Sequence, residues 1–191
     1  MNIFSLPVKS RRGPSERTLE IEYGKEFFNI KDKNVCEIGA VLRHWGIQSD
    51  HEVVDISEKG PNIINMDAID VDYMDKNVIC ISTIEHMGRV TIYNNMFEFG
   101  NADPEKPMKV FKKIVDQSKS FYITWPIGYC GDLDQFFLEN HAEYNYLLYM
   151  TEGDGSDEWV LADNMAGFKN LRYVIGDRFN VKNGLIIVYK I

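Results

Sequence analysis

Short apolar segments that alternate with helical ones constrain the fold of this chain more than any other feature. Five segments have the length and apolar character of buried parallel strands: 34–38, 51–56, 63–65, 77–82 and 120–125. Apolar residues recur at helical spacing in the stretches around them, over 18–30, 107–118 and 133–140. This alternation predicts an α/β fold built on an open, mostly parallel sheet.

The last third of the chain is richer in strand-like segments. Segments 144–150 and 158–162 flank the turn-forming sequence GDGS at 153–156. Segment 185–190 follows the dipeptide NG at 183–184, which is typical of hairpin turns. These segments predict an antiparallel C-terminal edge on the parallel sheet.

Composition, and the proline and glycine residues that interrupt regular structure, limit the possible domain organisation and partners. Residues 1–17 are interrupted by Pro7, Gly13 and Pro14, so we expect an irregular N-terminal arm followed by a single domain over 18–191. The net charge of −8 argues against nucleic acid as a partner. The three cysteines form no CxxC pair, and no stretch approaches the roughly 20 apolar residues of a membrane span. These features predict a cytoplasmic protein without a membrane segment, and they do not indicate an oligomeric state.

Polar residues collect where the predicted parallel strands end. Because right-handed crossovers place the C-terminal ends of parallel strands along one rim, these residues are expected to lie near one another. In strand order they are Glu37 and Gly39, Asp55, Asp67, then Ser82, Glu85 and His86, and finally Trp125 and Tyr129.

The residue types at this rim are those that hold an adenosine. A carboxylate at the end of the second strand, Asp55, can accept hydrogen bonds from both ribose hydroxyls. Gly39 lets backbone approach a ligand closely, and a further aspartate can accept a hydrogen bond from the adenine amino group. Neither G-x-x-x-x-G-K-[ST] nor G-x-G-x-x-G is present, so the sequence contains no evident binding loop for a pyrophosphate. An adenosine ligand without phosphate points to S-adenosyl-L-methionine (SAM).

Four motifs occur in an order that resembles class I SAM-dependent methyltransferases. They are EIG at 37–39, VVD at 53–55, NMDA at 65–68 and ICISTIEHMG at 79–88. The longer stretches EIGAVLRHWG, HEVVDISEKG, ISTIEHMG and WPIGY resemble a less characterised branch, similar to type 11 methyltransferases. The resemblance covers about residues 17–137. It implies a Rossmann-like, mostly parallel open sheet with helices on both faces.

The resemblance also implies two groups of site residues. The cofactor-binding residues would be Glu37, Gly39 and Ala40 at the methionine end, Asp55 at the ribose, Asp67 and Ala68 at the adenine, and Ser82 in the floor of the site. Glu85, Trp125 and Tyr129 would border the acceptor pocket, and His86 would be the catalytic residue. The helix over 18–30 would cover the cofactor, with Glu20 or Glu22 near it.

The roles of His86 and of its neighbour Glu85 have alternatives. His86 can be a general base, because an imidazole titrates near neutral pH, or a structural residue that caps the next helix. The Glu85-His86 pair resembles the metal-binding pair of small-RNA 2′-O-methyltransferases, but those enzymes carry a further glutamate where this chain has Ser82. One glutamate and one histidine are too few ligands for a metal site, so we assign no metal.

Other rim residues are equally open to a second interpretation. Asp70 and Asp72 compete with Asp67 for the adenine role, and all three can belong to a solvated loop. Trp125 and Tyr129 can complete the core instead of lining a pocket, since aromatic residues at strand ends often pack inside.

The sequence therefore predicts an enzyme, a SAM-dependent methyltransferase. The acceptor is unidentified. A chain of this length leaves no room for a separate recognition domain, which favours a small molecule or a glycan. The first alternative is a non-catalytic scaffold or regulatory protein with the same fold, because the later glycines of the first loop are missing. The second is an NAD-dependent oxidoreductase, whose ribose Asp55 would suit equally well.

Overall fold

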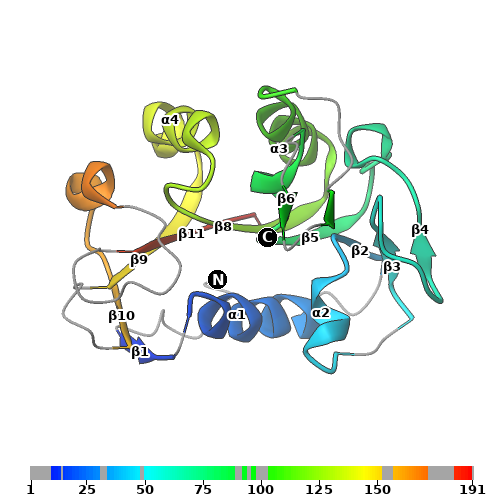
Figure 1. The fold of residues 1–191 in the computed structure, drawn as a ribbon, viewed down its shortest axis with the longest axis horizontal. Helices are drawn as coiled ribbons and strands as arrows, with labels where there is room; N and C mark the ends of the chain where they lie inside the picture. Colours follow the sequence, from blue (N-terminus) through cyan, green and yellow to red (C-terminus); the bar gives the residue numbers. More distant parts are fainter. Residues whose placement is uncertain are drawn as a thin grey trace.

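The apolar segments of the sequence come together in one nine-stranded sheet with helices on both faces (Figure 1). The computed structural model describes residues 10–13, 15–30, 34–47, 50–88, 92–93, 96–97, 103–151, 157–171 and 183–190. The predicted α/β class, with a Rossmann-like, mostly parallel sheet, is confirmed by the strand order.

One half of the sheet is parallel and contains all five predicted parallel strands. They are β2 (Val35–Ile38), β3 (Glu52–Val54), β4 (Ile63–Ile64), β5 (Asn77–Ile81) and β8 (Ser120–Pro126). Their order is β4-β3-β2-β5-β8, and each neighbouring pair is parallel. The chain thus moves outward from β2 in one direction and then from β5 in the other. The gap between the ends of β2 and β5 is the switch point at which ligands of such sheets bind.

The other half of the sheet is antiparallel, as predicted for the C-terminal segments. Strand β11 (Gly184–Lys190) lies between β8 and β9 (Asn145–Thr151) and is antiparallel to both. Strand β10 (Glu158–Leu161) pairs with β9 beyond it. The predicted hairpin turn at 183–184 is wrong, because the Thr151 amide donates to the Asn183 carbonyl and Gly184 already pairs with Met150.

Part of the expected irregular arm is a strand. Ser10–Arg12 forms the edge strand β1, which pairs with β10 in the antiparallel direction. Residues 1–9 and 14 lie outside the described residues. Residues 10–12 therefore belong to the nine-stranded sheet.

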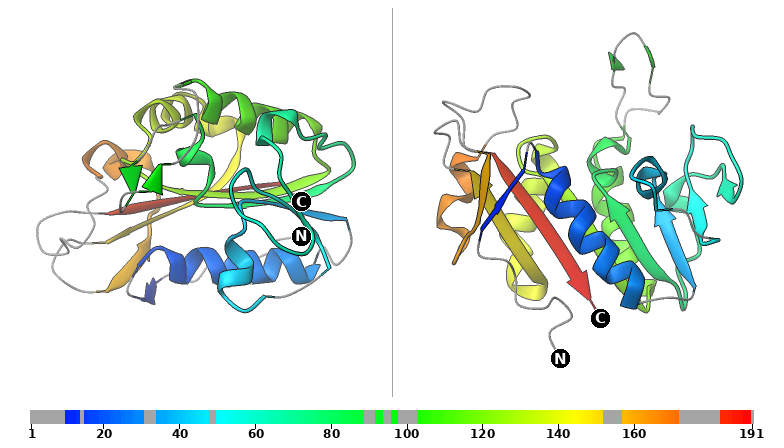
Figure 2. Two further views of the ribbon diagram at one scale, coloured as in Figure 1. Left: turned by 45° about the vertical axis from the view of Figure 1, so that its right-hand side comes forward. Right: turned by 90° about the horizontal axis from the view of Figure 1, so that it is seen from below.

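The helices pack on opposite faces of the sheet (Figure 2). The helix α1 (Arg17–Ile30) covers one face, where Leu19 and Phe27 join a core with the side chains of β5 and β11. The helices α3 (Lys106–Gln117) and α4 (Gly131–Asn140) cover the other face, and Phe111 and Phe137 are fully buried there. Figure 1 shows the four-residue helix α2 (Val41–His44) on the α1 side.

Several short elements lie in the connections between the longer ones. They are the 3-10 helices η1 (Ala68–Asp70), η2 (Ile84–His86), η3 (His141–Glu143) and η4 (Met165–Asn170), and the small antiparallel pair β6 (Ile92–Tyr93) and β7 (Met96–Phe97). Within the described ranges, no helix is both long and apolar enough to cross a membrane.

Candidate functional site

The ends of neighbouring parallel strands are tied to one another by backbone hydrogen bonds. The Gly39 amide donates to the Val54 carbonyl at 2.9 Å, and the Ser82 amide donates to the Thr124 carbonyl at 3.1 Å. Gly39, Asp55 and Ser82 therefore follow adjacent strands at the switch point. Two parts of this rim are described in turn: the first loop (residues 37–42) and the acid cluster (Glu20, Ser82, Glu85 and Thr124).

Glu37 fixes the first loop from inside the protein. One carboxylate oxygen accepts a hydrogen bond from the Leu42 amide at 2.7 Å, and the other lies 2.7 Å from Nε2 of His51. Both side chains of the Glu37–His51 pair are buried, and the His51 ring packs edge-on against Phe28. Both carboxylate oxygens of Glu37 therefore have partners within the protein.

Position 39 requires a glycine because of its backbone conformation and because of the nearby Thr83 side chain. Its φ is +82°, a conformation that favours glycine, and a Cβ atom there would lie 2.2 Å from Oγ1 of Thr83. From the sequence, Gly39 was expected to let a ligand come close to the backbone. In the structure, the Thr83 side chain lies at this position.

The amides at the start of α2 all have acceptors within the chain. The Ala40 amide donates to Oδ2 of Asp55 at 3.1 Å, the Val41 amide to the Gly39 carbonyl at 2.9 Å, and the Leu42 amide to Glu37. In dinucleotide sites such amides bind the pyrophosphate. Two carboxylates and a backbone carbonyl of the protein take that place here.

Asp55 stands at the end of β3 and is half-buried. Its Oδ1 accepts hydrogen bonds from the amides of Ser57 and Glu58, both at 2.8 Å, and from the Ser57 hydroxyl. Burial alone would raise the pKa of Asp55, but these bonds and the one from Ala40 outweigh it and hold the pKa below its usual value. Oδ2 has one donor, from Ala40, and a carboxylate oxygen can accept a second.

Asp67 caps η1, and Ala68 lies behind it in the core. The Asp67 side chain accepts a hydrogen bond from the Ile69 amide at 3.2 Å and forms an ion pair with Lys106 of α3. Ala68 is buried, and its carbonyl accepts the Tyr73 hydroxyl at 2.8 Å. Of the three competing aspartates, Asp67 is half-buried, whereas Asp70 and Asp72 are exposed.

Three exposed apolar residues lie in the segments next to Asp55, on the loop after β3 and on and after β4, and the sequence patterns did not single them out. Ile56, Ile64 and Met66 are 57%, 42% and 41% exposed. Ile64 lies on the neighbouring strand, and its carbonyl accepts the Asp55 amide at 3.1 Å. Exposed apolar side chains beside a carboxylate suit a ligand that has a flat apolar face and hydroxyl donors. The available signal was an isoleucine directly after the strand-end aspartate in a polar loop.

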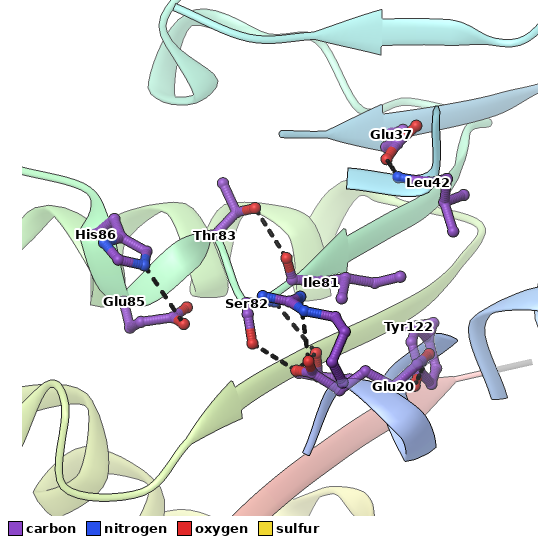
Figure 3. Close-up of polar contacts among 11 residues, drawn as sticks. Glu20, Glu37, Leu42, Ile81, Ser82, Thr83, Glu85, His86 and Tyr122 are labelled. Carbon is purple, nitrogen blue, oxygen red and sulfur yellow. Dashed lines mark hydrogen bonds and ion pairs between the residues drawn. The ribbon is translucent and has the colours of Figure 1, made fainter. Parts of the chain in front are cut away.

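The acid cluster lies beyond β5, where α1 meets the sheet (Figure 3). Glu20 is buried, and one of its oxygens accepts the hydroxyls of Ser82 at 2.5 Å and Thr124 at 2.6 Å. Its other oxygen lies 3.1 Å from the Arg17 guanidinium. Burial raises the pKa of Glu20, although Arg17 and the two hydroxyls oppose this effect. Glu20 thus lies beside Ser82 at the rim, and its partner Thr124 was not indicated by the sequence.

Ser82 holds a strained backbone at the centre of this cluster. Its φ of +38° is unusual for a residue with a side chain. The strain persists because the Ser82 amide and hydroxyl are both held, by Thr124 and Glu20. Strained residues of this kind concentrate at functional sites.

Glu85, His86 and Tyr129 form a polar row at the rim. Oε1 of Glu85 lies 3.9 Å from Nε2 of His86, and Nδ1 of His86 lies 3.0 Å from the Tyr129 hydroxyl. The Glu85 side chain is 1% exposed, and its Oε2 has no hydrogen-bond partner in the described part of the protein. Burial, and to a lesser degree the charge of Glu20, raise the pKa of Glu85 well above its ordinary value. The structure thus brings three sequence-predicted residues together.

Trp125 does not border this row. It is fully buried between Phe111 and Phe137, and its indole nitrogen donates to Asp134 at 3.0 Å. This position favours the core interpretation of Trp125, whereas the half-buried Tyr129 stays at the rim. Among the described residues, no group of three or more His, Cys, Asp or Glu side chains is placed to hold a metal ion.

Comparisons with known proteins find a weak structural similarity between this chain and two solved structures. No protein-family model and no curated protein match the chain. Two structures of magnesium protoporphyrin IX methyltransferase (ChlM) from Synechocystis PCC 6803 are similar to it, each at 11% identity. The one with bound SAM has a TM-score of 0.41 and covers 90% of this chain and 78% of that chain. The one with bound SAH, S-adenosylhomocysteine, has a TM-score of 0.34 and covers 93% and 89%. Similarity at this level does not by itself identify a family or an activity.

Proposed function

We propose that this chain is a SAM-dependent methyltransferase acting on a small-molecule or glycan acceptor. The observation that carries the proposal is the use of the α2 amides by Asp55, Gly39 and Glu37. A pyrophosphate would need those amides, whereas SAM contains no phosphate and carries a positive sulfonium. An adenosine site lined by carboxylates suits such a cation.

The charges at the rim argue against the NAD-dependent alternative. Arg17 is paired with Glu20, and Lys106 is paired with Asp67, so neither cation is available to a pyrophosphate without breaking an ion pair. Adding two phosphate charges to these carboxylates would be repulsive. A thermal-shift comparison of NAD with SAM separates the two functions, and we expect only SAM to raise the melting temperature.

Asp55 and the apolar residues beside it would hold the nucleoside. The remaining acceptor capacity of Asp55 Oδ2 would take a ribose hydroxyl, and Ile56 and Met66 would contact the faces of the adenine. The methyl group would then lie toward the acid cluster, across the switch point between β2 and β5. Methyl transfer would be a direct displacement, with catalysis arising mainly from holding the acceptor in line with the sulfonium methyl.

Isothermal titration with SAM and with SAH tests the proposal. Both should bind, and Asp55→Ala should weaken binding about tenfold or more, because a hydrogen bond to a charged group contributes about 1.5–3 kcal/mol. Asp72→Ala is the matched control, since Asp72 is an exposed aspartate that caps only its own turn. Failure of both ligands to bind at millimolar concentration would sink the proposal.

A non-catalytic scaffold is the second candidate, favoured by one feature of the first loop. Thr83 occupies the space over Gly39, and Glu37 is satisfied within the chain. If this loop is closed to ligands, neither SAM nor SAH will bind. The protein will nevertheless unfold cooperatively as a stable domain, and that pair of results would support the scaffold.

A further inference from the structure

The guanidinium of Arg17, at the start of α1, has unsatisfied donors beside the acid cluster. Its Nη1 lies 3.1 Å from Oε2 of Glu20. Neither of these two atoms has a hydrogen-bond partner among the described residues, so the two charges are close but poorly aligned. Arg17 has no other hydrogen bond or ion pair with the described part of the protein. Because a guanidinium carries five N–H donors, Arg17 can donate to a ligand while its pair with Glu20 stays in place.

Arg17 also differs from Glu20 in its access to solvent. Its side chain is 25% exposed, whereas that of Glu20 is fully buried. The pair lies at the rim, because Glu20 accepts the hydroxyl of Ser82, the residue directly after β5. The charge of Arg17 opposes the raised pKa of both Glu20 and Glu85, which places the guanidinium near both carboxyls. A ligand at the switch point can therefore contact Arg17 from the solvent side.

The amino-acid end of SAM needs a hydrogen-bond donor at this rim. It carries a carboxylate, which proteins bind with backbone amides at a helix N-terminus or with arginine. The amides at the start of α2 already donate to Asp55, Gly39 and Glu37. The first loop therefore leaves the carboxylate of SAM without a donor, and a side chain has to supply one.

We propose that Arg17 binds the carboxylate of the methionine end of SAM through the exposed part of its guanidinium. This inference rests on the proposed methyl transfer and adds to it a cofactor-binding residue on α1. With the nucleoside at Asp55, the methionine chain would cross from the end of β2 to the end of β5, where Arg17 pairs with Glu20. The planar guanidinium and the carboxylate can then form two parallel hydrogen bonds.

Two other cations near the rim are placed for different contacts. Lys106 forms an ion pair with Asp67, the residue that caps η1. Arg43 is exposed on α2, and its Nη1 lies 2.7 Å from the position that a Cβ atom on Gly60 would take, in the loop after β3. The charged groups of both residues therefore lie toward the nucleoside end of the proposed site, away from the methionine end.

The Arg17–Glu20 pair suits the methionine end better than it suits a pyrophosphate. The methionine end carries an ammonium as well as a carboxylate, so it adds no net charge beside Glu20. A pyrophosphate would add two negative charges there and would draw Arg17 away from Glu20. The same ion pair thus accommodates the first ligand and opposes the second.

Decarboxylated SAM tests the proposal without knowledge of the acceptor. This analogue keeps the adenosine, the sulfonium and the amino group of SAM and lacks only the carboxylate. In isothermal titration, we expect the wild-type chain to bind SAM at least about tenfold more tightly than the analogue. Arg17→Gln should weaken SAM binding about tenfold and should not weaken binding of the analogue. Arg43→Gln, which changes an exposed arginine outside the proposed contact, is the matched control and should keep the preference for SAM.

The outcomes separate this inference from the methyl-transfer proposal. Equal affinity of the wild-type protein for SAM and its decarboxylated analogue would overturn the carboxylate contact. An Arg17→Gln variant that keeps the preference for SAM, or an Arg43→Gln variant that loses it, would overturn the role of Arg17. In each of these cases SAM still binds, and the methyl-transfer proposal stands. If neither SAM nor SAH binds, the methyl-transfer proposal fails and takes this inference with it.

A second variant covers the case in which Arg17→Gln does not fold, which chemical denaturation would reveal. Arg17→Lys keeps a positive charge beside Glu20 but has no planar fork of donors. It should therefore lose part of the preference for SAM over the analogue. Full retention of the preference by Arg17→Lys would overturn the paired hydrogen bonds proposed for Arg17.

Discussion

The first loop and the acid cluster lie at adjacent strand ends but differ in how their charges are satisfied. Around the first loop, Glu37 and Asp55 accept hydrogen bonds from backbone amides, and Glu37 also pairs with His51. In the acid cluster, Oε2 of the buried Glu85 has no hydrogen-bond partner in the described part of the protein, and Ser82 is held at a strained φ. The hydrogen-bonded carboxylates at the loop stabilise the protein, whereas burial of the Glu85 carboxyl with one unpartnered oxygen is unfavourable.

The largest effect is expected from removing the carboxylate that fixes the first loop. Glu37→Ala leaves His51 and the Leu42 amide buried without their acceptor, so it should lower the free energy of unfolding by about 3–5 kcal/mol. Urea denaturation measures the change. Glu105→Ala removes an exposed glutamate that pairs only with Lys109 and should change stability by less than about 0.5 kcal/mol. A similar small change at Glu37 would show that the loop is not stabilised by this group.

Gly39→Ala should have the next largest effect. The new methyl group meets Thr83 and the backbone is left-handed, so we expect a loss of about 2–4 kcal/mol. Gly46→Ala is a matched control, because Gly46 has a similar φ of +75° and no atom within 4 Å of the added Cβ. Its cost should be only the backbone strain, about 1–2 kcal/mol. Thr83→Ala combined with Gly39→Ala should recover part of the difference, because it removes the hydroxyl and methyl groups that meet the added Cβ; full additivity would contradict the contact.

Asp55→Asn tests the charged support of the first loop and should cost about 1–2 kcal/mol at pH 7. The pKa of Asp55 is lowered in the folded protein, so its contribution exists above the ordinary pKa of 3.8 and is lost as the pH falls below it. The difference between variant and wild type should therefore shrink in acid. Denaturation curves from pH 7 to pH 3 measure this trend, and Asp72→Asn should show no comparable trend.

Glu85→Gln should have the smallest effect on stability and the opposite sign. Removing an unsupported buried acid should leave stability unchanged or raise it by about 1 kcal/mol. The pKa of Glu85 is raised by burial, so the wild-type protein loses stability as the pH rises above the ordinary value of 4.5. The advantage of the variant should grow over that range. A destabilised variant with no pH trend would place Glu85 among the structural residues.

The parallel half of the sheet could be predicted from the sequence because its signals are local. Segments such as 77–82 and 120–125 are continuous apolar runs, and all five predicted strands form. Strand β1 (Ser10–Arg12) was missed because its residues are polar and its only strand partner, β10, lies far away in the sequence. The NG pair at 183–184 was misleading because β9 and β8 hold Gly184 in an extended strand.

The candidate site could be predicted as a position but not as a set of contacts. Strand-end acids at 37 and 55 identified the rim because parallel strands end on the same side. The partners of those acids are set by the tertiary fold: Glu37 with His51, and Glu20 with Ser82, which is 62 residues away. Sequence patterns contain no information about which carboxyl oxygen is left without a hydrogen-bond partner. For this reason the distinction between Glu37 and Glu85 required the structure.

The placement of β11 has a consequence for the order of folding during synthesis. Residues 184–190 fill the position between β8 and β9, two strands that are made well before them. Until β11 emerges from the ribosome, both strands present unpaired edges whose apolar side chains are open to other chains. The parallel half can pair early, but the two halves join only through β11. A nascent chain that pauses before residue 184 should therefore be a substrate for chaperones that recognise exposed strand edges.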